Sequence, residues 1–135
     1  MTETIYLDSG IFIAALIRRD GFHMQARELF GRCGLRWITS VLVLSECHSW
    51  FLHRHGEEAA RRLRDFIAAL NGIQLLGFML DDHERTLHML DRFRGAALTY
   101  VDAASLAIIE QRKIRTVWST DHHLGLTGAE ILPRS

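Results

Sequence analysis

The sequence predicts an α/β domain built on a mostly parallel sheet of roughly five strands. Short apolar, β-branched segments alternate along the chain with longer segments of helical period. Strands separated by helices pair in parallel, because a crossover returns the chain to the same end of the sheet. The 135 residues, 48% of them apolar, are enough for one core and too few for two. We therefore expect a single domain over residues 1–135.

The first half of the chain contains two predicted strands and three predicted helices. These elements are a strand at 4–8, helices at 9–20 and 21–34, a strand at 36–39 and a helix at 41–56. The run TIYLD is typical of a buried strand and ends at Asp8. Glycine closes the second helix, and Ser40 is a suitable N-cap for the third.

The second half of the chain continues the alternation. Its predicted elements are helices at 57–72, 81–95 and 102–113 and strands at 73–78, 115–120 and 129–133. The helix at 57–72 has acids in its first turn, apolar residues at helical spacing and Asn-Gly at its end. The helix at 81–95 also begins with acids, and it ends with arginines, as the helix dipole favours.

Charge and composition exclude several classes of protein. The 16 basic and 16 acidic side chains cancel, which argues against a strongly basic nucleic-acid-binding domain. No apolar run reaches the roughly 18 residues of a membrane span, and the N-terminus lacks the basic region of a signal peptide. We therefore expect a cytoplasmic protein without a membrane partner. Cys33 and Cys47 match no metal-binding spacing, so we interpret them as reduced packing residues.

Four acids occupy positions where a parallel α/β sheet binds its ligands, at the carboxyl ends of the strands. Asp8 ends the first predicted strand, Asp121 follows the strand at 115–120, and Asp102 opens the helix that leads into that strand. Glu46 lies in an apolar helix without a lysine nearby, where a buried carboxylate needs a partner. A divalent cation explains that environment best.

Each acid alone also has an ordinary structural interpretation. Asp8 and Asp102 are both suitable helix N-caps, Asp121 suits a turn, and Glu46 suits the exposed rim of its helix. Their convergence on one side of the predicted sheet favours a site for a hard cation. Magnesium and manganese, which prefer oxygen ligands, are therefore the predicted cofactors.

The segments around the four acids resemble the motifs of one protein family. They are YLDSGIFIAAL at the first acid, ITSVLVLSE at the second, LTYVDAASLAIIEQ at the third and VWSTDHHL at the fourth. In this order and spacing they resemble PIN-domain ribonucleases, and most of all the small VapC-type toxins of toxin–antitoxin pairs. The chain departs from the family at two points. Ser9 stands where threonine is common, and histidines follow the last acid where a bulky residue is common.

This resemblance implies a three-layer α/β/α PIN domain with Mg²⁺- or Mn²⁺-dependent endoribonuclease activity, that is, a hydrolase of RNA phosphodiester bonds. It also implies the role of toxin in a type II pair, a homodimer, and a cognate VapB-like antitoxin that blocks the acidic pocket. Asp8 and Asp102 are then predicted to hold the principal metal. Asp121 and Glu46 are predicted to complete its shell through waters, to take a second ion, or to orient the attacking water.

Other polar residues are predicted to support this chemistry. The hydroxyls predicted to contact the acids or the substrate are those of Ser9, Ser119 and Thr120. The cations predicted to contact RNA phosphates are Arg54, Arg61 and Arg64. Capping explains the hydroxyls equally well, and a solvated helix face explains the arginines. The histidines show no zinc-binding HExxH pattern and are interpreted as surface or substrate-edge residues.

Two other functions stay open from the sequence. A catalytically silent PIN fold would bind a protein or RNA without cleaving it, and the four intact acids argue against this. A receiver-like phosphoacceptor domain also combines a parallel sheet, aspartates and magnesium. That chemistry needs a lysine at the end of a later strand, whereas the single lysine of this chain, Lys113, precedes its strand.

Overall fold

The sheet of this computed structural model has five strands, all parallel, in the order β3-β2-β1-β4-β5. The strands are β1 (Glu3–Leu7), β2 (Leu35–Ser40), β3 (Gln74–Leu76), β4 (Thr116–Trp118) and β5 (Glu130–Leu132). The predicted strands and their parallel pairing are thus confirmed. The structure describes residues 2–134; Met1 and Ser135, which the predicted domain includes, lie outside the described residues.

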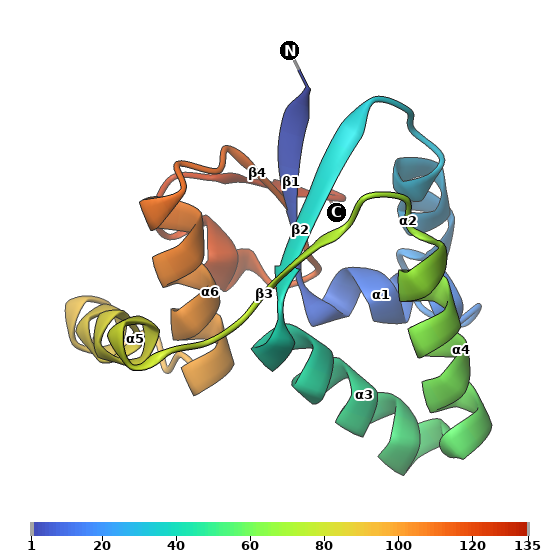
Figure 1. Cartoon of the computed structure of the whole chain (residues 1–135), viewed down its shortest axis with the longest axis horizontal. Coiled ribbons are helices and arrows are strands. Elements are labelled where there is room, and N and C mark those ends of the chain that lie inside the picture. The colour runs from blue at the N-terminus through green and yellow to red at the C-terminus, as the bar shows by residue number, and fades with distance from the viewer. Residues whose placement is uncertain (1, 135) are drawn as a thin grey trace.

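The helices of residues 2–134 cover both faces of the sheet. They are α1 (Ser9–Leu16), α2 (His23–Phe30), α3 (Val41–His55), α4 (Glu57–Ala69), α5 (Leu80–Arg92), α6 (Tyr100–Gln111) and the 3-10 helix η1 (His122–Gly125). Helices α5 and α6 lie on one side of the sheet, and α1, α2 and α4 lie on the other (Figure 1). This is the predicted three-layer arrangement. No helix within the described residues is both long and apolar enough to cross a membrane.

Strand β1 lies at the centre of the sheet, between β2 and β4. Ile5 pairs with Trp37 of β2 on one side and with Thr116 of β4 on the other. The strand is buried from Ile5 onward, as expected for a parallel sheet with helices on both faces. Because neighbouring parallel strands run in the same direction, the segments after β1, β2 and β4 meet at one edge of the sheet.

A cluster of aromatic rings fixes α1, α2 and α4 to the sheet. The ring of Phe30 lies 5.1 Å from that of Phe66 and 5.2 Å from that of Trp118, both in edge-to-face geometry. Phe12 and Trp37 complete the cluster at 6.1 Å from Phe30. Such pairs stabilise a core beyond the apolar area that they bury. Trp118 is fully buried and immediately precedes Ser119, so the cluster also fixes the chain where it leaves β4.

Helix α6 begins earlier than the sequence predicts. Its N-cap is Thr99, whose hydroxyl accepts a hydrogen bond from the Asp102 amide. Asp102 is therefore the third helical residue and not the one that opens the helix. The prediction was wrong because aspartate is a common N-cap, whereas Thr99 and Asp102 form the reciprocal pair known as a capping box.

The two cysteines lie in different environments. Cys47 is fully buried in α3, and burial raises the pKa of its thiol. This agrees with its interpretation as a packing residue. Cys33 is exposed, so the same interpretation was wrong for it. It lies in the short segment between α2 and β2, which also contains glycines at positions 31 and 34.

Candidate active site

The four predicted acids come from four separate segments near the carboxyl edge of the sheet. Asp8 directly follows β1 and precedes α1, and Asp121 lies between β4 and η1. Glu46 comes from α3, which starts at the end of β2, and Asp102 comes from the first turn of α6. Because the supporting elements are rigid, the backbone fixes the direction from which each carboxylate approaches.

Asp8 is the most buried of the four acids, with 5% of its surface exposed. It stands at the N-cap position of α1, but its side chain makes no capping hydrogen bond. Instead, the Ser119 hydroxyl donates a hydrogen bond of 2.8 Å to Asp8 Oδ2. Burial raises the pKa of Asp8 from 3.8 to about 6, and the nearby charges of Glu46 and Asp102 act in the same direction. The hydrogen bonds from Ser119 and Ser9 oppose that rise in pKa.

Asp102 is half-buried and held in place by the start of its own helix. Its Oδ2 accepts a hydrogen bond of 3.1 Å from the Thr99 amide, and its own amide donates to the Thr99 hydroxyl at 3.1 Å. The capping interpretation of Asp102 is therefore correct in part, although as the partner of the N-cap residue. This pairing fixes one carboxylate oxygen and leaves the other for a ligand.

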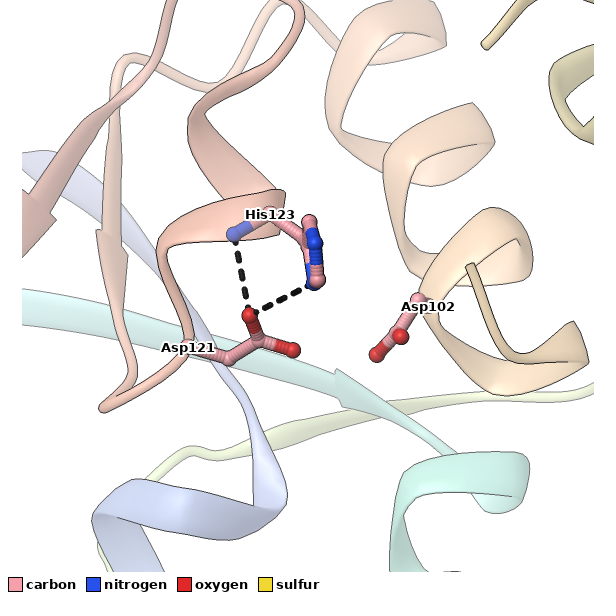
Figure 2. A group of neighbouring side chains, drawn as sticks. All are labelled: Asp102, Asp121 and His123. Atoms are coloured by element: carbon pink, nitrogen blue, oxygen red, sulfur yellow. Dashed lines mark hydrogen bonds and ion pairs between the residues drawn. The ribbon is translucent and has the colours of Figure 1, made fainter. Parts of the chain in front are cut away.

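Asp121 forms a compact group with His123 and Asp102. Asp121 Oδ1 accepts a hydrogen bond of 2.9 Å from the His123 amide and lies 3.0 Å from His123 Nδ1. Figure 2 shows the other oxygen of Asp121 directed toward Asp102. Ligand atoms of Asp102, Asp121 and His123 all lie within 4.8 Å of one another, an arrangement suited to a metal ion.

Sequence reasoning missed His123. It interpreted His123 as a surface or substrate-edge residue and not as a possible metal ligand, whereas the His123 side chain is only 29% exposed and lies beside Asp121. The available signal was the spacing Asp121-x-His123 directly after a strand. An aspartate in that position accepts a hydrogen bond from the amide two residues later, which turns the following side chain back toward it.

Glu46 is half-buried, and its partner within the chain is a hydroxyl. Ser9 Oγ donates a hydrogen bond of 2.8 Å to Glu46 Oε1. Sequence reasoning expected a partner with positive charge for this carboxylate. Among the ion pairs of residues 2–134, none joins Asp8, Glu46, Asp102 or Asp121 to a lysine or arginine. Within residues 2–134, the negative charge of these four acids is therefore not offset by a paired lysine or arginine.

Buried hydroxyls connect the elements that carry the acids. Ser119 Oγ, besides donating to Asp8, accepts a hydrogen bond of 2.9 Å from the Asp121 amide. It thus ties the two strand ends together. Tyr6 and Ser105, both at most 1% exposed, share a hydrogen bond of 2.8 Å between β1 and α6. Tyr6 precedes Asp8 by two residues in the sequence, so this bond links the strand of one acid to the helix of another.

The hydroxyls and the arginines that the sequence predicts to be functional lie in different parts of the structure. Ser9 and Ser119 contact acids directly, as the preceding distances show. Thr120 lies against Gly10, where its Oγ1 would stand 2.3 Å from an added Cβ atom. The three arginines lie on the hairpin of α3 and α4. Their partners there are His48, at 2.9 Å from Arg64, and the Trp50 ring, 5.2 Å below the Arg54 guanidinium.

The donor set of this site fits a divalent cation of the magnesium or manganese type. Apart from the His123 ring nitrogen, its atoms are carboxylate oxygens, the ligands that these ions prefer. The raised pKa of Asp8 reports a local excess of negative charge and burial that a bound cation would relieve. Asp8 and Asp102 each have one oxygen positioned by a neighbouring donor, as a ligand requires.

Comparison with known proteins identifies the family. The model of the PIN domain family matches residues 5–129. The chain belongs to the PIN domain family. The matched residues include all four acids, which confirms the family that the sequence motifs predicted. No curated protein sequence matches the chain.

Solved structures of toxins share this PIN fold. VapC20 of Mycobacterium tuberculosis, described as a sarcin-ricin loop cleaving toxin, is 22% identical, with a TM-score of 0.84 over 93% of this chain and 95% of that chain. A toxin–antitoxin complex from Klebsiella pneumoniae is 17% identical, with a TM-score of 0.65 over 96% of each chain. VapBC2 of Rickettsia felis, bound to a DNA fragment from its promoter, is 11% identical, with a TM-score of 0.64 over 95% and 96%. At these identities the likeness is one of fold.

Proposed function

We propose that this PIN domain is a metal-dependent endoribonuclease and acts as the toxin of a type II toxin–antitoxin pair. The observation that carries the proposal is the set of carboxylates at one edge of the sheet, with no lysine or arginine paired to them among residues 2–134. Such a set fits a hard divalent cation, and a cation held by carboxylates is suited to phosphodiester chemistry.

The four acids have different roles in this proposal. Asp8 and Asp102 hold the principal Mg²⁺ or Mn²⁺ ion, and hydrogen bonds from Ser119 and Thr99 orient their carboxylates. Asp121 and Glu46 complete the shell through waters, take a second ion, or orient the attacking water. When bound, the cation offsets the negative charge that develops on the phosphate oxygens during cleavage.

The assignment of RNA as the substrate and of an antitoxin as the partner rests on the fold. VapC20 is described as a sarcin-ricin loop cleaving toxin, and two other structures of this fold are described as a toxin–antitoxin complex and as VapBC2. Exposed apolar side chains on β3, on α5 and at the residue that caps α5 support an interface with a second copy or with an antitoxin. These side chains are Leu75, Met79, Leu80 and Leu87.

A cleavage assay tests the activity. The purified chain, freed of any bound protein, is incubated with total RNA and Mg²⁺ or Mn²⁺. We expect cleavage, its loss in EDTA, and its return when the metal is restored. Asp102→Asn lowers the rate by about 100-fold or more, because one ligand of the cation loses its charge.

The control for this assay is Asp91→Asn, which changes an exposed aspartate of α5 and leaves the rate unchanged. Wild-type protein that does not cleave RNA contradicts the proposal. Equal cleavage by wild type in EDTA and by Asp102→Asn in metal contradicts it as well, because the site acids would then have no part in the reaction.

The arginines of the α3–α4 hairpin give a separate prediction. If Arg61 and Arg64 contact RNA phosphates, the double change to glutamine weakens RNA binding by about tenfold at moderate salt and makes binding less sensitive to salt. The rate at saturating RNA stays the same. Binding is measured by fluorescence anisotropy of a labelled RNA over a range of salt concentrations. An unchanged salt dependence would assign both arginines to a solvated helix face.

A further inference from the structure

We infer that His123 is a ligand of the metal and gives the site a preference for Mn²⁺ over Mg²⁺. The inference deepens the proposed function and rests on its metal site. It concerns a residue that lies outside the four acids, and it assigns a nitrogen ligand to a site that the sequence predicted to consist of oxygens. The argument depends on the position of one imidazole ring.

The turn after β4 aims the His123 ring at the acids. Asp121 caps η1 and accepts the His123 amide at 2.9 Å, so the backbone fixes the start of the side chain. The ring then returns to the same carboxylate, with Nδ1 at 3.0 Å from Oδ1. Figure 2 shows the His123 ring beside the gap between the Asp121 and Asp102 carboxylates. The His123 side chain is therefore held at the site by two contacts with one acid.

The spacing of these atoms suits coordination of one ion. In octahedral coordination with bonds of about 2.1 Å, adjacent ligand atoms lie about 3.0 Å apart. The distance between His123 Nδ1 and Asp121 Oδ1 is 3.0 Å, and the Asp102 ligand atom lies within 4.8 Å of both residues. Small rotations of side chains bring all three to one ion. Coordination through Nδ1 requires this nitrogen to carry no proton, so the ion would take the place of the present contact between Nδ1 and Asp121 Oδ1.

The chemistry of the ring determines the selectivity. Magnesium prefers oxygen ligands and gives up its waters reluctantly, whereas transition metals accept imidazole nitrogen readily. A site built only from the four carboxylates would bind Mg²⁺ and Mn²⁺ through the same atoms. One nitrogen added to that set raises affinity for Mn²⁺ much more than for Mg²⁺.

The neighbouring His122 provides a matched control. Its ring lies 4.5 Å from the His123 ring, but it is exposed and belongs to none of the groups suited to a metal within residues 2–134. The two residues have the same chemistry and almost the same place in the chain. A change at His122 therefore tests whether an effect belongs to the ring facing the acids or to the local charge and stacking.

Isothermal titration calorimetry of the full chain, stripped of metal, tests the inference without RNA. Mn²⁺ and Mg²⁺ are titrated separately into wild type, His123→Ala, His122→Ala and His123→Asp. We expect wild type to bind Mn²⁺ about tenfold more tightly than Mg²⁺. His123→Ala loses about tenfold in Mn²⁺ affinity and about twofold or less in Mg²⁺ affinity. His122→Ala retains the wild-type ratio.

The aspartate variant separates ligation from a structural role. His123→Asp replaces the nitrogen by oxygen, so we expect it to bind both ions but to lose the preference for Mn²⁺. A residue that only supported the fold would change both affinities alike and leave their ratio intact. Circular dichroism of each variant without metal shows whether it is folded, and the ratio is compared between folded variants.

One result would overturn the inference: an unchanged ratio of Mn²⁺ to Mg²⁺ affinity in His123→Ala, whether both affinities stay the same or both fall by the same factor. Failure of the proposed nuclease function gives a different experimental result from failure of this inference. A chain that binds Mn²⁺ selectively through His123 but does not cleave RNA keeps this inference and loses the nuclease assignment. A chain that cleaves RNA while His123→Ala leaves the ratio unchanged keeps the nuclease assignment and loses this inference.

Discussion

Asp8→Asn is expected to make the metal-free protein more stable at neutral pH and, at the same time, to remove its nuclease activity. Asp8 is 5% exposed, and its pKa is raised to about 6 by burial and by the nearby charges of Glu46 and Asp102. At neutral pH the folded, metal-free chain must therefore keep a buried carboxylate charged. The asparagine side chain has a similar shape and carries no charge, so it avoids that cost.

The direction of the pH dependence follows from the raised pKa. Because the carboxyl binds its proton more tightly in the folded state than in the unfolded state, its stabilising contribution is complete below pH 3.8. This contribution is lost as the pH rises through about 6. A rise in pKa from 3.8 to about 6 corresponds to about 3 kcal/mol. The stability difference between Asp8→Asn and wild type should therefore grow by up to about 3 kcal/mol between pH 4 and pH 7.

Urea unfolding in EDTA, followed by circular dichroism at a series of pH values, measures this difference. Mn²⁺ should reverse the order of stability at neutral pH, because it binds the folded wild type and not the variant. RNA cleavage by Asp8→Asn falls by about 100-fold or more. Asp65→Asn, which changes an exposed aspartate of α4, serves as the control. Its difference in stability from wild type should not grow between pH 4 and pH 7. A difference that stays constant from pH 4 to pH 7 would contradict the assignment of the shift to Asp8.

The positions of the acids were predictable because they depend on backbone topology. Asp8 and Asp121 each follow a strand that the apolar pattern identifies, and parallel strands bring their carboxyl ends to one edge. That rule needs no knowledge of side-chain rotamers. The same argument explains why the fold class and the parallel pairing of the strands agree with expectation. The apolar pattern and the parallel topology are properties of whole segments. An error of one or two residues at the predicted end of a helix or strand therefore does not change the predicted fold.

The partners of the acids were not predictable, because they depend on contacts between residues distant in the sequence. The Ser9 hydroxyl reaches Glu46 across 37 positions, and Ser119 reaches Asp8 across 111. A hydroxyl after a strand suits a cap or a turn equally well until the neighbouring segment is placed. His123 was missed for a related reason. Its role depends on the conformation of the short turn at η1, and histidine there carries no periodic signal.

Gly10→Ala is expected to destabilise the protein and to weaken metal binding, although it adds a single methyl group. Gly10 lies in the first turn of α1, against the chain segment that leads to Asp121. A Cβ atom there would stand 2.3 Å from Thr120 Oγ1 and 3.1 Å from the Thr120 amide nitrogen. The hydroxyl can rotate away, but the amide belongs to the backbone. Relief of the contact therefore requires α1 and the segment at Thr120 to separate.

That separation affects both stability and the site. Overpacking of this kind costs about 1–3 kcal/mol, which urea unfolding detects as a lower midpoint with an unchanged slope. Movement of Thr120 also shifts Asp121, whose distance to His123 and Asp102 defines the group suited to a metal. We therefore expect the affinity for Mn²⁺, measured by calorimetry, to fall by about tenfold.

Two further variants identify the contact responsible. Gly21→Ala adds the same methyl group where no atom lies within 4 Å, so it should leave stability and Mn²⁺ affinity unchanged. In Gly10→Ala combined with Thr120→Ala, the hydroxyl at 2.3 Å is gone and only the amide contact at 3.1 Å and the Cβ contact at 3.3 Å persist. The double variant should therefore recover part of the lost stability, because the two residues are in direct contact and their effects are not additive. If Gly10→Ala binds Mn²⁺ like wild type, the close approach of α1 to Thr120 has no part in positioning Asp121.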